Sequence, residues 1–93
     1  MLRIFRVQGD SMKPLLDDGD FVLALVIARR ARVNRLLVVQ HPEYGVIVKR
    51  VIGVNADGSC WLGSENASGV DTLKMGQISQ EQVLGRVLWR IRR

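Results

Sequence analysis

Hydrophobic residues occur along this chain in short runs separated by segments rich in glycine, asparagine and aspartate. The runs that we interpret as strands span residues 2–8, 21–27, 36–40, 45–52, 59–62 and 83–91. Tight turns are expected at 17–20 and at 55–58, where Asp-Gly is a strong hairpin signal. A long polar loop is expected over 63–76 and a short turn over 78–83. The pattern predicts an all-β, mainly antiparallel fold, built as a sandwich or a coiled, barrel-like sheet.

The length of 93 residues favours one domain that spans residues 1–93. The longest apolar run, 21–28, has eight residues, whereas a membrane-spanning helix needs about 20. The N-terminal residues lack the apolar core and cleavage site of a signal peptide. Cys60 is the only cysteine, so no intrachain disulfide can form, and we interpret it as a small buried hydrophobe. We therefore expect a soluble, cytoplasmic chain without a membrane anchor.

The charge is +5, and arginines gather at 29–35 and at 90–93. Such a balance suggests an acidic partner: nucleic acid, an anionic membrane surface or an acidic polypeptide. The arginines are not interleaved with aromatic residues, and no recognition helix is evident, so we expect no DNA-binding domain. A solvated basic rim is the favoured interpretation. The alternative is a non-catalytic β-domain that binds a peptide or nucleic acid through the 29–35 patch.

Ser11 is the first candidate for chemistry. It lies in the segment 9–14, Gly-Asp-Ser-Met-Lys-Pro, where a predicted strand ends and the chain turns. Gly9 permits a tight bend and close approach of a substrate, and backbone N–H groups at such a turn can face a developing oxyanion. Taken alone, this tripeptide is a weak signal that also fits an ordinary polar turn.

Lys49 is the second candidate, because it lies in a predicted strand where Ile47 and Val51 share its face. Desolvation among aliphatic side chains disfavours the charged amine and lowers its pKa from an ordinary value of about 10.4. A neutral lysine can take the proton of a serine hydroxyl and so replace histidine in a hydrolase. The alternative is a strand lysine whose amine reaches solvent.

The remaining titratable residues carry weaker signals. His41 is the only histidine, and we interpret it as a surface or loop residue rather than as part of a triad with Asp20 or Asp71. One cysteine and one histidine cannot close a zinc site, and no phosphate-binding or calcium loop is complete. We therefore expect no metal and no cofactor.

Four ordered segments together resemble the Ser-Lys peptidases that include type I signal peptidases and the self-cleaving domain of LexA-like repressors. They are 9–16, 18–22, 48–53 (Val-Lys-Arg-Val-Ile-Gly) and, more weakly, 64–76, and the segment 85–87 resembles the closing strand of the family. The compact size and the Gly-Asp-Ser-Met start also resemble the proteases that trim the N-terminus of nickel superoxide dismutase.

The resemblance implies a coiled, mainly antiparallel β-sheet domain in which Ser11 is the nucleophile and Lys49 the general base. It implies that the backbone N–H of Ser11 serves the oxyanion. Gly9, Asp10 and Met12 would form the oxyanion and substrate-binding site. It further implies that Asp71 organises the loop beneath the site and that a nearby serine supports the lysine.

Several departures from the family pattern accompany the match. The family commonly has Gly-Asp where this chain has Asn34 and Arg35. The supporting serine would fall on Gly69, so the neighbouring Ser68 is our candidate for that role. The Ala-Gly and Cys-Gly pairs that such repressors cleave in themselves do not occur, so we do not expect self-cleavage. The sequence predicts a soluble serine endopeptidase that cuts a protein or peptide substrate at a limited site, for example to remove a leader.

Overall fold

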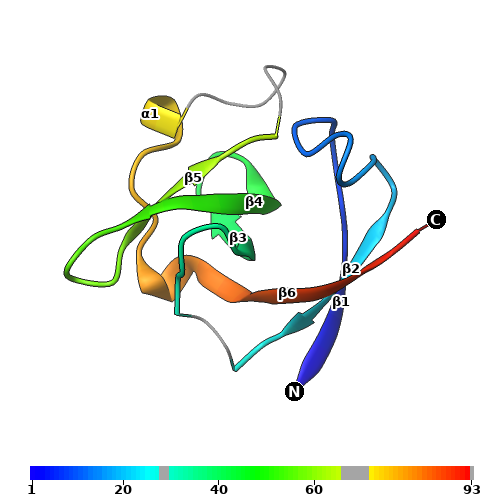
Figure 1. Cartoon of the computed structure of the whole chain (residues 1–93), viewed down its shortest axis with the longest axis horizontal. Coiled ribbons are helices and arrows are strands. Elements are labelled where there is room, and N and C mark those ends of the chain that lie inside the picture. Colours follow the sequence, from blue (N-terminus) through cyan, green and yellow to red (C-terminus); the bar gives the residue numbers. More distant parts are fainter. Residues whose placement is uncertain (28–29, 66–71, 93) are drawn as a thin grey trace.

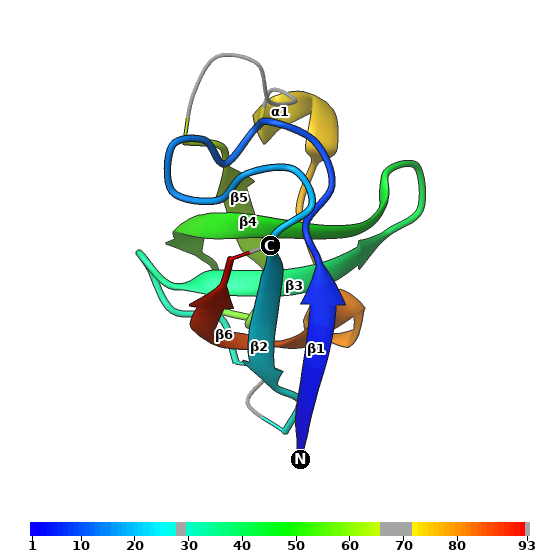
Figure 2. The ribbon, with the colours of Figure 1, turned by 90° about the vertical axis from the view of Figure 1, so that its right-hand side faces the viewer.

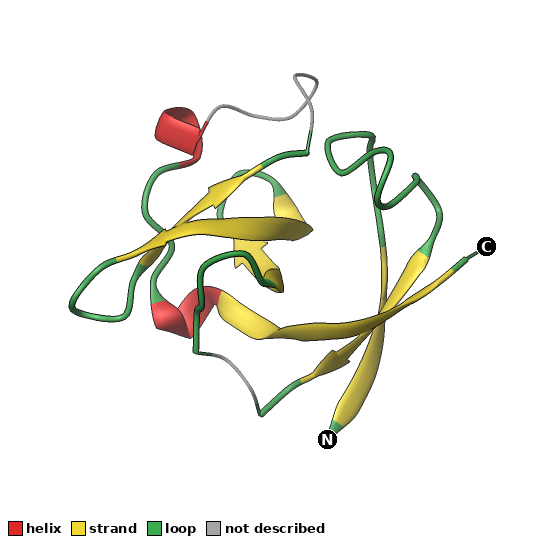
Figure 3. Cartoon of the chain, viewed as in Figure 1, coloured by secondary structure: helices red, strands yellow, loops and turns green. Residues whose placement is uncertain are grey.

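Six strands form a single sheet in the computed structural model, which describes residues 1–27, 30–65 and 72–92 (Figure 1). The strands are β1 (Leu2–Arg6), β2 (Phe21–Leu25), β3 (Leu36–His41), β4 (Gly45–Val54), β5 (Cys60–Gly63) and β6 (Val83–Ile91). A short helix, α1 (Thr72–Met75), and a 3-10 helix, Gln80–Gln82, lie between β5 and β6 (Figure 3). Every strand pairing is antiparallel, which confirms the predicted fold class.

The strand order is β1-β2-β6-β3-β4-β5. The strand β6 therefore lies between two hairpin-like units, one made of β1 and β2 and the other of β3, β4 and β5. Register shifts interrupt the ladders at Leu23/Ala24, at Val38/Val39 and between Val51 and Gly53. Such irregularities bend strands and increase their twist, so the sheet is strongly curved and its inward side chains lie close together.

The coiled sheet encloses two clusters of buried apolar residues, one on each of its sides. The first consists of Ala31, Leu37, Val39, Val51, Cys60, Leu62, Met75, Ile78 and Val83. The second consists of Phe5, Val7, Met12, Leu16, Val22, Ala24, Val38 and Val48. Neighbouring residues of β3 divide between the clusters, as the alternation of side chains along a strand requires.

One glycine of β6 is required by the pairing with β2. A Cβ atom on Gly85 would lie 2.9 Å from the carbonyl oxygen of Leu25, which is closer than side chains tolerate. Because backbone atoms form this contact, they cannot move aside as a flexible side chain would. The absent side chain therefore lets β6 approach β2 and join the two halves of the sheet.

Most predicted element boundaries lie close to the observed ones, and the larger differences are these. The runs at 2–8 and 21–27 end as strands at Arg6 and Leu25, and the run at 45–52 continues to Val54. The polar segment 63–76, expected to be a loop, contains the helix Thr72–Met75. The predicted turn at 55–58 is confirmed, because the N–H of Gly58 donates to the carbonyl of Asn55 at 3.0 Å.

Candidate active site

Ser11 lies on the long loop that connects β1 with β2, at one end of these strands (Figure 2). At its base the N–H of Val7 donates to the carbonyl of Asp20 at 2.7 Å, which continues the β1–β2 ladder into the loop. The Asp18 carboxylate accepts a hydrogen bond from the N–H of Gly9 at 2.9 Å. Gly9 has a φ of +84°, a conformation that favours glycine. The Asp-Gly-Asp segment before β2 thus closes the loop that carries the serine.

Apolar side chains anchor the same loop from beneath. Met12 and Leu16 are 2% and 1% exposed, and the N–H of Leu16 donates to the Met12 carbonyl at 2.8 Å. Ser11 itself is only half-buried. The residue after the serine is therefore a core residue, and its burial holds Ser11 at the surface of the cluster.

Lys49 lies in the middle of β4, opposite Leu37 of β3, as the strand assignment requires. Its side chain is 4% exposed, and its neighbours on the same face are half-buried Ile47 and fully buried Val51. Desolvation by this burial lowers the pKa of the Lys49 amine from its ordinary value of 10.5. The expected aliphatic environment of the lysine is present.

The two candidate residues meet through their side chains. Lys49 Nζ lies 2.5 Å from Ser11 Oγ and 2.8 Å from Ser64 Oγ. An amine between two hydroxyl oxygens is held in one position, and a hydrogen bond to the serine is the geometry that proton transfer needs. Ser64 follows β5 directly, so three segments that are distant in sequence converge at this amine.

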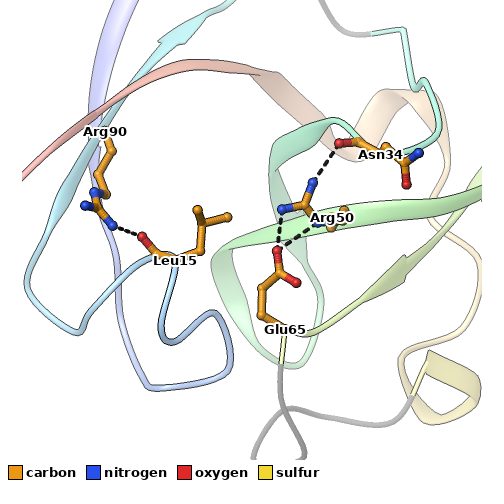
Figure 4. A network of polar contacts seen from close by, with 5 residues as sticks. All are labelled: Leu15, Asn34, Arg50, Glu65 and Arg90. Atoms are coloured by element: carbon orange, nitrogen blue, oxygen red, sulfur yellow. Dashed lines mark hydrogen bonds and ion pairs between the residues drawn. The ribbon is translucent and has the colours of Figure 1, made fainter.

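A second set of contacts ties the segment after β5 to the serine loop and to β4. The N–H of Glu65 donates to the Ser11 carbonyl at 2.8 Å. The Glu65 carboxylate accepts hydrogen bonds from the guanidinium of Arg50, the residue after the lysine (Figure 4). Arg50 also donates from Nη1 to the carbonyl of Asn34 at 2.8 Å. The pairs Lys49–Ser64 and Arg50–Glu65 form two adjacent links between β4 and this segment.

Asn34 explains one departure from the family pattern. Its φ is +73°, in the left-handed region where asparagine is among the few side chains that are tolerated. It stands where the family commonly has glycine, a residue that also tolerates this conformation.

The supporting serine that we predicted lies outside the described residues, as does Asp71. The serine that does contact the lysine is Ser64, which sequence reasoning did not single out. Ser64 is the first residue of the segment 64–76, the weakest of the four matches to the family. The signal that could have identified it is its position directly after β5, the strand that pairs with β4 and so lies beside Lys49.

A cavity of about 200 Å³ opens beside the two side chains. Its lining includes the serine, the lysine and the three residues predicted for the oxyanion and substrate site, Gly9, Asp10 and Met12. The remaining lining residues are mostly apolar: Val7, Gln8, Tyr44, Ile47, Val48 and Met75. The hollow is therefore suited to an apolar side chain of a bound peptide.

His41 holds two walls of this cavity together. It is 7% exposed, so the predicted surface position is wrong. Its Nδ1 accepts hydrogen bonds from the N–H groups of Glu43 at 3.0 Å and Tyr44 at 3.3 Å. This leaves Nε2–H to donate to the Met75 carbonyl at 3.0 Å. Both ring nitrogens bind backbone, and the ring links the β3–β4 turn to α1.

The other candidate residues do not form a second site. Cys60 is fully buried, as predicted, and burial raises the pKa of its thiol, which keeps it protonated. A larger hollow of about 670 Å³ lies away from the serine and lysine, against Arg30, Asp57 and Glu81. Within residues 1–27, 30–65 and 72–92, no group of three or more histidine, cysteine or acidic side chains is arranged to hold a metal. None of the helices in this part of the chain is long and apolar enough to cross a membrane.

An all-β fold that brings a serine hydroxyl and a buried lysine amine together has the arrangement of Ser-Lys hydrolases. The sequence signature of Peptidase S24-like proteins matches residues 1–88, so the chain belongs to this family. Membership supports a serine peptidase function. No curated protein matches the chain.

Proposed function

We propose that the protein is a serine endopeptidase in which Ser11 is the nucleophile and Lys49 the general base. The single observation that carries this proposal is the 2.5 Å separation of Ser11 Oγ and Lys49 Nζ, with the amine buried among aliphatic side chains. The same separation favours the enzyme over a β-domain that only binds peptide or nucleic acid.

The reaction follows from these two groups. The neutral amine of Lys49 takes the proton of the Ser11 hydroxyl while Oγ attacks the scissile carbonyl carbon. The resulting ammonium returns the proton to the departing amine as the C–N bond breaks, which leaves an acyl-serine. Lys49 then deprotonates a water molecule that attacks this ester, and the proton returns to Ser11 Oγ as the acid product leaves.

Backbone groups of the serine loop are suited to stabilise the oxyanion. The carbonyl of Ser11 accepts the Glu65 N–H, so its orientation is fixed and the loop cannot turn freely. We assign the Ser11 N–H to the oxyanion and assign Gly9, Asp10 and Met12 to the walls that receive the substrate. We also assign the supporting role to Ser64, because its hydroxyl accepts a hydrogen bond from Lys49.

The substrate that we propose is a protein from which a leader or propeptide is removed. Support comes from the cavity of about 200 Å³ beside the serine and lysine, which is large enough to receive a side chain of an extended peptide segment. The resemblance to nickel superoxide dismutase maturation proteases makes the precursor of that enzyme the first substrate to test.

The test uses the purified protein and its Ser11→Ala, Lys49→Ala and Lys49→Arg variants. Each is incubated with this precursor and with a cell proteome, and new N-termini are mapped by mass spectrometry. All three variants are expected to lose cleavage, because arginine cannot lose its proton to act as a base. Ser79→Ala and Lys74→Ala, which replace exposed residues, should cleave normally. Cleavage by the folded Ser11→Ala protein at the wild-type sites would overturn the proposal.

A further inference from the structure

A further hollow lies at the far end of the serine loop, away from the Lys49 amine. Its volume is about 260 Å³, and it shares no lining residue with the cavity beside Ser11. Residues 9–12 of the serine loop line that cavity, whereas residues 15–16 of the same loop line the further hollow. We call the hollow lined by residues 15–16, 34–36 and 87–90 the basic hollow.

The walls of the basic hollow are mostly apolar. Leu16 is 1% exposed, and half-buried Leu36 and Val87 pack against the second core cluster. Walls of this kind favour a ligand with an apolar body over a fully hydrated ion. Sites for drug-sized ligands typically have volumes of about 300–1,000 Å³. The volume of the basic hollow lies below this range, so its occupant must be small.

The charge of the basic hollow comes from two arginines, Arg35 and Arg90. In the part of the chain that the structure describes, none of the lining residues is acidic, and neither arginine forms an ion pair. Two guanidinium groups on apolar walls therefore give the hollow a positive charge that an anion would complement.

Acids of the neighbouring segments do not neutralise this charge. Glu65 is bound by the guanidinium of Arg50. Asp18 and Asp20 each accept a hydrogen bond from a backbone N–H of their own loop. Asp17 is exposed and does not line the hollow.

Backbone contacts hold both arginines near the hollow. Arg90 donates from Nη1 to the carbonyl of Leu15 (Figure 4). The N–H of Arg35 donates to the Arg32 carbonyl at 3.1 Å, and its carbonyl accepts the N–H of Val51 at 2.9 Å. A guanidinium has five N–H donors, so Arg90 can bind the loop carbonyl and a carboxylate at the same time.

Two sets of hydrogen bonds connect the basic hollow with Ser11, and Figure 4 shows both. One is the contact between Arg90 and the serine loop. The other begins at the Asn34 carbonyl, which Arg50 binds. Glu65 continues it, because its carboxylate binds the same guanidinium and its N–H donates to the Ser11 carbonyl. An occupant that restrains residues 34–36 and the end of β6 should therefore also restrain the serine loop.

We propose that the basic hollow binds a small free carboxylic acid with an apolar body, and that the bound acid orders the serine loop. The apolar body packs against Leu36 and Val87, and the carboxylate binds the guanidinium groups of Arg35 and Arg90. Without an anion these like charges repel each other, and a carboxylate removes that repulsion. A bare anion would leave the apolar walls without contacts, and an uncharged molecule would leave the arginines without a counter-charge. This inference does not depend on the proposed peptidase activity.

Binding is measured by isothermal titration calorimetry with hexanoate, hexanol and inorganic phosphate. We expect saturable binding of hexanoate in the millimolar range. Hexanol and phosphate should each bind about tenfold more weakly, because hexanol lacks the charge and phosphate lacks the apolar body. In a Trp61→Phe background, Trp89 is the remaining tryptophan and lines the hollow. Its emission should change over the same range of hexanoate concentration.

Substitutions separate the basic hollow from the rest of the surface. Arg35→Gln and Arg90→Gln should each weaken hexanoate binding about tenfold, because each removes a charge-assisted hydrogen bond. Arg32→Gln replaces an exposed arginine that does not line the hollow, and it should bind like wild type. Leu88→Ser should weaken binding about fivefold, whereas Leu73→Ser, on α1, is its matched control. Circular dichroism of each variant checks that it is folded.

Amide hydrogen exchange tests the ordering of the serine loop. The N–H of Leu16 donates to the Met12 carbonyl, and the N–H of Glu65 donates to the Ser11 carbonyl. Both should exchange more slowly with hexanoate, and the same concentration should have little effect on Arg35→Gln. The Ser11→Ala protein should bind hexanoate as wild type does, so loss of cleavage and loss of binding are distinguishable.

Four results would overturn the inference. Absence of saturable hexanoate binding, or equal weakening by Arg32→Gln and Arg35→Gln, would exclude the site. Phosphate binding as tight as that of hexanoate would show a general anion site. Tighter binding of acetyl-Ala-Ala-Leu with a free carboxylate would assign the hollow to the C-terminus of a peptide. Unchanged exchange at Leu16 and Glu65 would exclude the ordering of the loop.

Discussion

Lys49 is buried in the candidate active site, and this burial lowers the pKa of its amine from 10.5. The base must be neutral, so kcat/KM is expected to rise with pH through this lowered pKa. The measurement is kcat/KM against pH with a cleavable peptide. A rate that is flat or falls across the neutral to alkaline range would contradict the assignment of Lys49 as base.

The lowered pKa of Lys49 also makes the stability of the folded protein depend on pH. Since the folded pKa of Lys49 is below the unfolded value, the unfolded state binds more protons between the two. The free energy of unfolding should therefore rise with pH over this interval, and below the folded pKa the buried ammonium destabilises the fold. Lys49→Met should remove this rise along with activity. Denaturant titrations at several pH values test it, and equal slopes for both proteins would count against a depressed pKa.

The proposed positioning role of Ser64 rests on its contact of 2.8 Å with Lys49 Nζ. Ser64→Ala should lower kcat about tenfold, because the ammonium that forms when Lys49 takes the serine proton loses one hydrogen bond, and leave KM nearly unchanged. It should also move the pH range over which kcat/KM rises. Ser64→Thr keeps the hydroxyl and should recover much of the rate. If Ser64→Ala and Ser79→Ala behave alike, the contact has no role in catalysis.

At the scale of elements, His41 joins the end of β3 to α1, and both of its ring nitrogens are hydrogen-bonded to backbone. His41→Ala should lower the free energy of unfolding by about 2 kcal/mol, because buried backbone groups lose their partners. It should also raise KM more than it lowers kcat, since the cavity walls at Tyr44 and Met75 are no longer tied together.

A conservative variant of His41 separates the hydrogen bonds of its Nδ1 from the hydrogen bond of its Nε2. His41→Asn supplies an oxygen close to the position of Nδ1, which keeps an acceptor for the Glu43 and Tyr44 N–H groups but not the bond to Met75. We expect intermediate stability, measured by thermal unfolding, with KM still raised. Wild-type stability in His41→Ala would show that the link is not structural.

For the whole molecule, short apolar runs and turn residues were sufficient to predict the strands and the all-β class, because the buried residues of each strand stand out from the polar turns in the sequence. The bounds of β6 match the predicted run, and the turn at 55–58 forms as expected. The contact between Ser11 and Lys49 was expected from the motif around each residue together with the resemblance of the ordered motifs to Ser-Lys peptidases.

What the sequence did not reveal depends on contacts between distant segments. The helix at 72–75 is too short for a periodic pattern. The burial of His41 requires Met75, which lies 34 residues further along the chain. Along β1, the alternation shows that Leu2 and Ile4 face one way, but only the folded sheet shows that this side is left open.

The position of β6 determines when, during synthesis, the candidate site can form. This strand is synthesised after the other five, yet it lies between the half that carries Ser11 and the half that carries Lys49. A ribosome-bound chain that still lacks β6 has no continuous sheet to hold the hydroxyl against the amine. Ser11 and Lys49 are therefore expected to come together only after β6 has been made and has joined the two halves of the sheet.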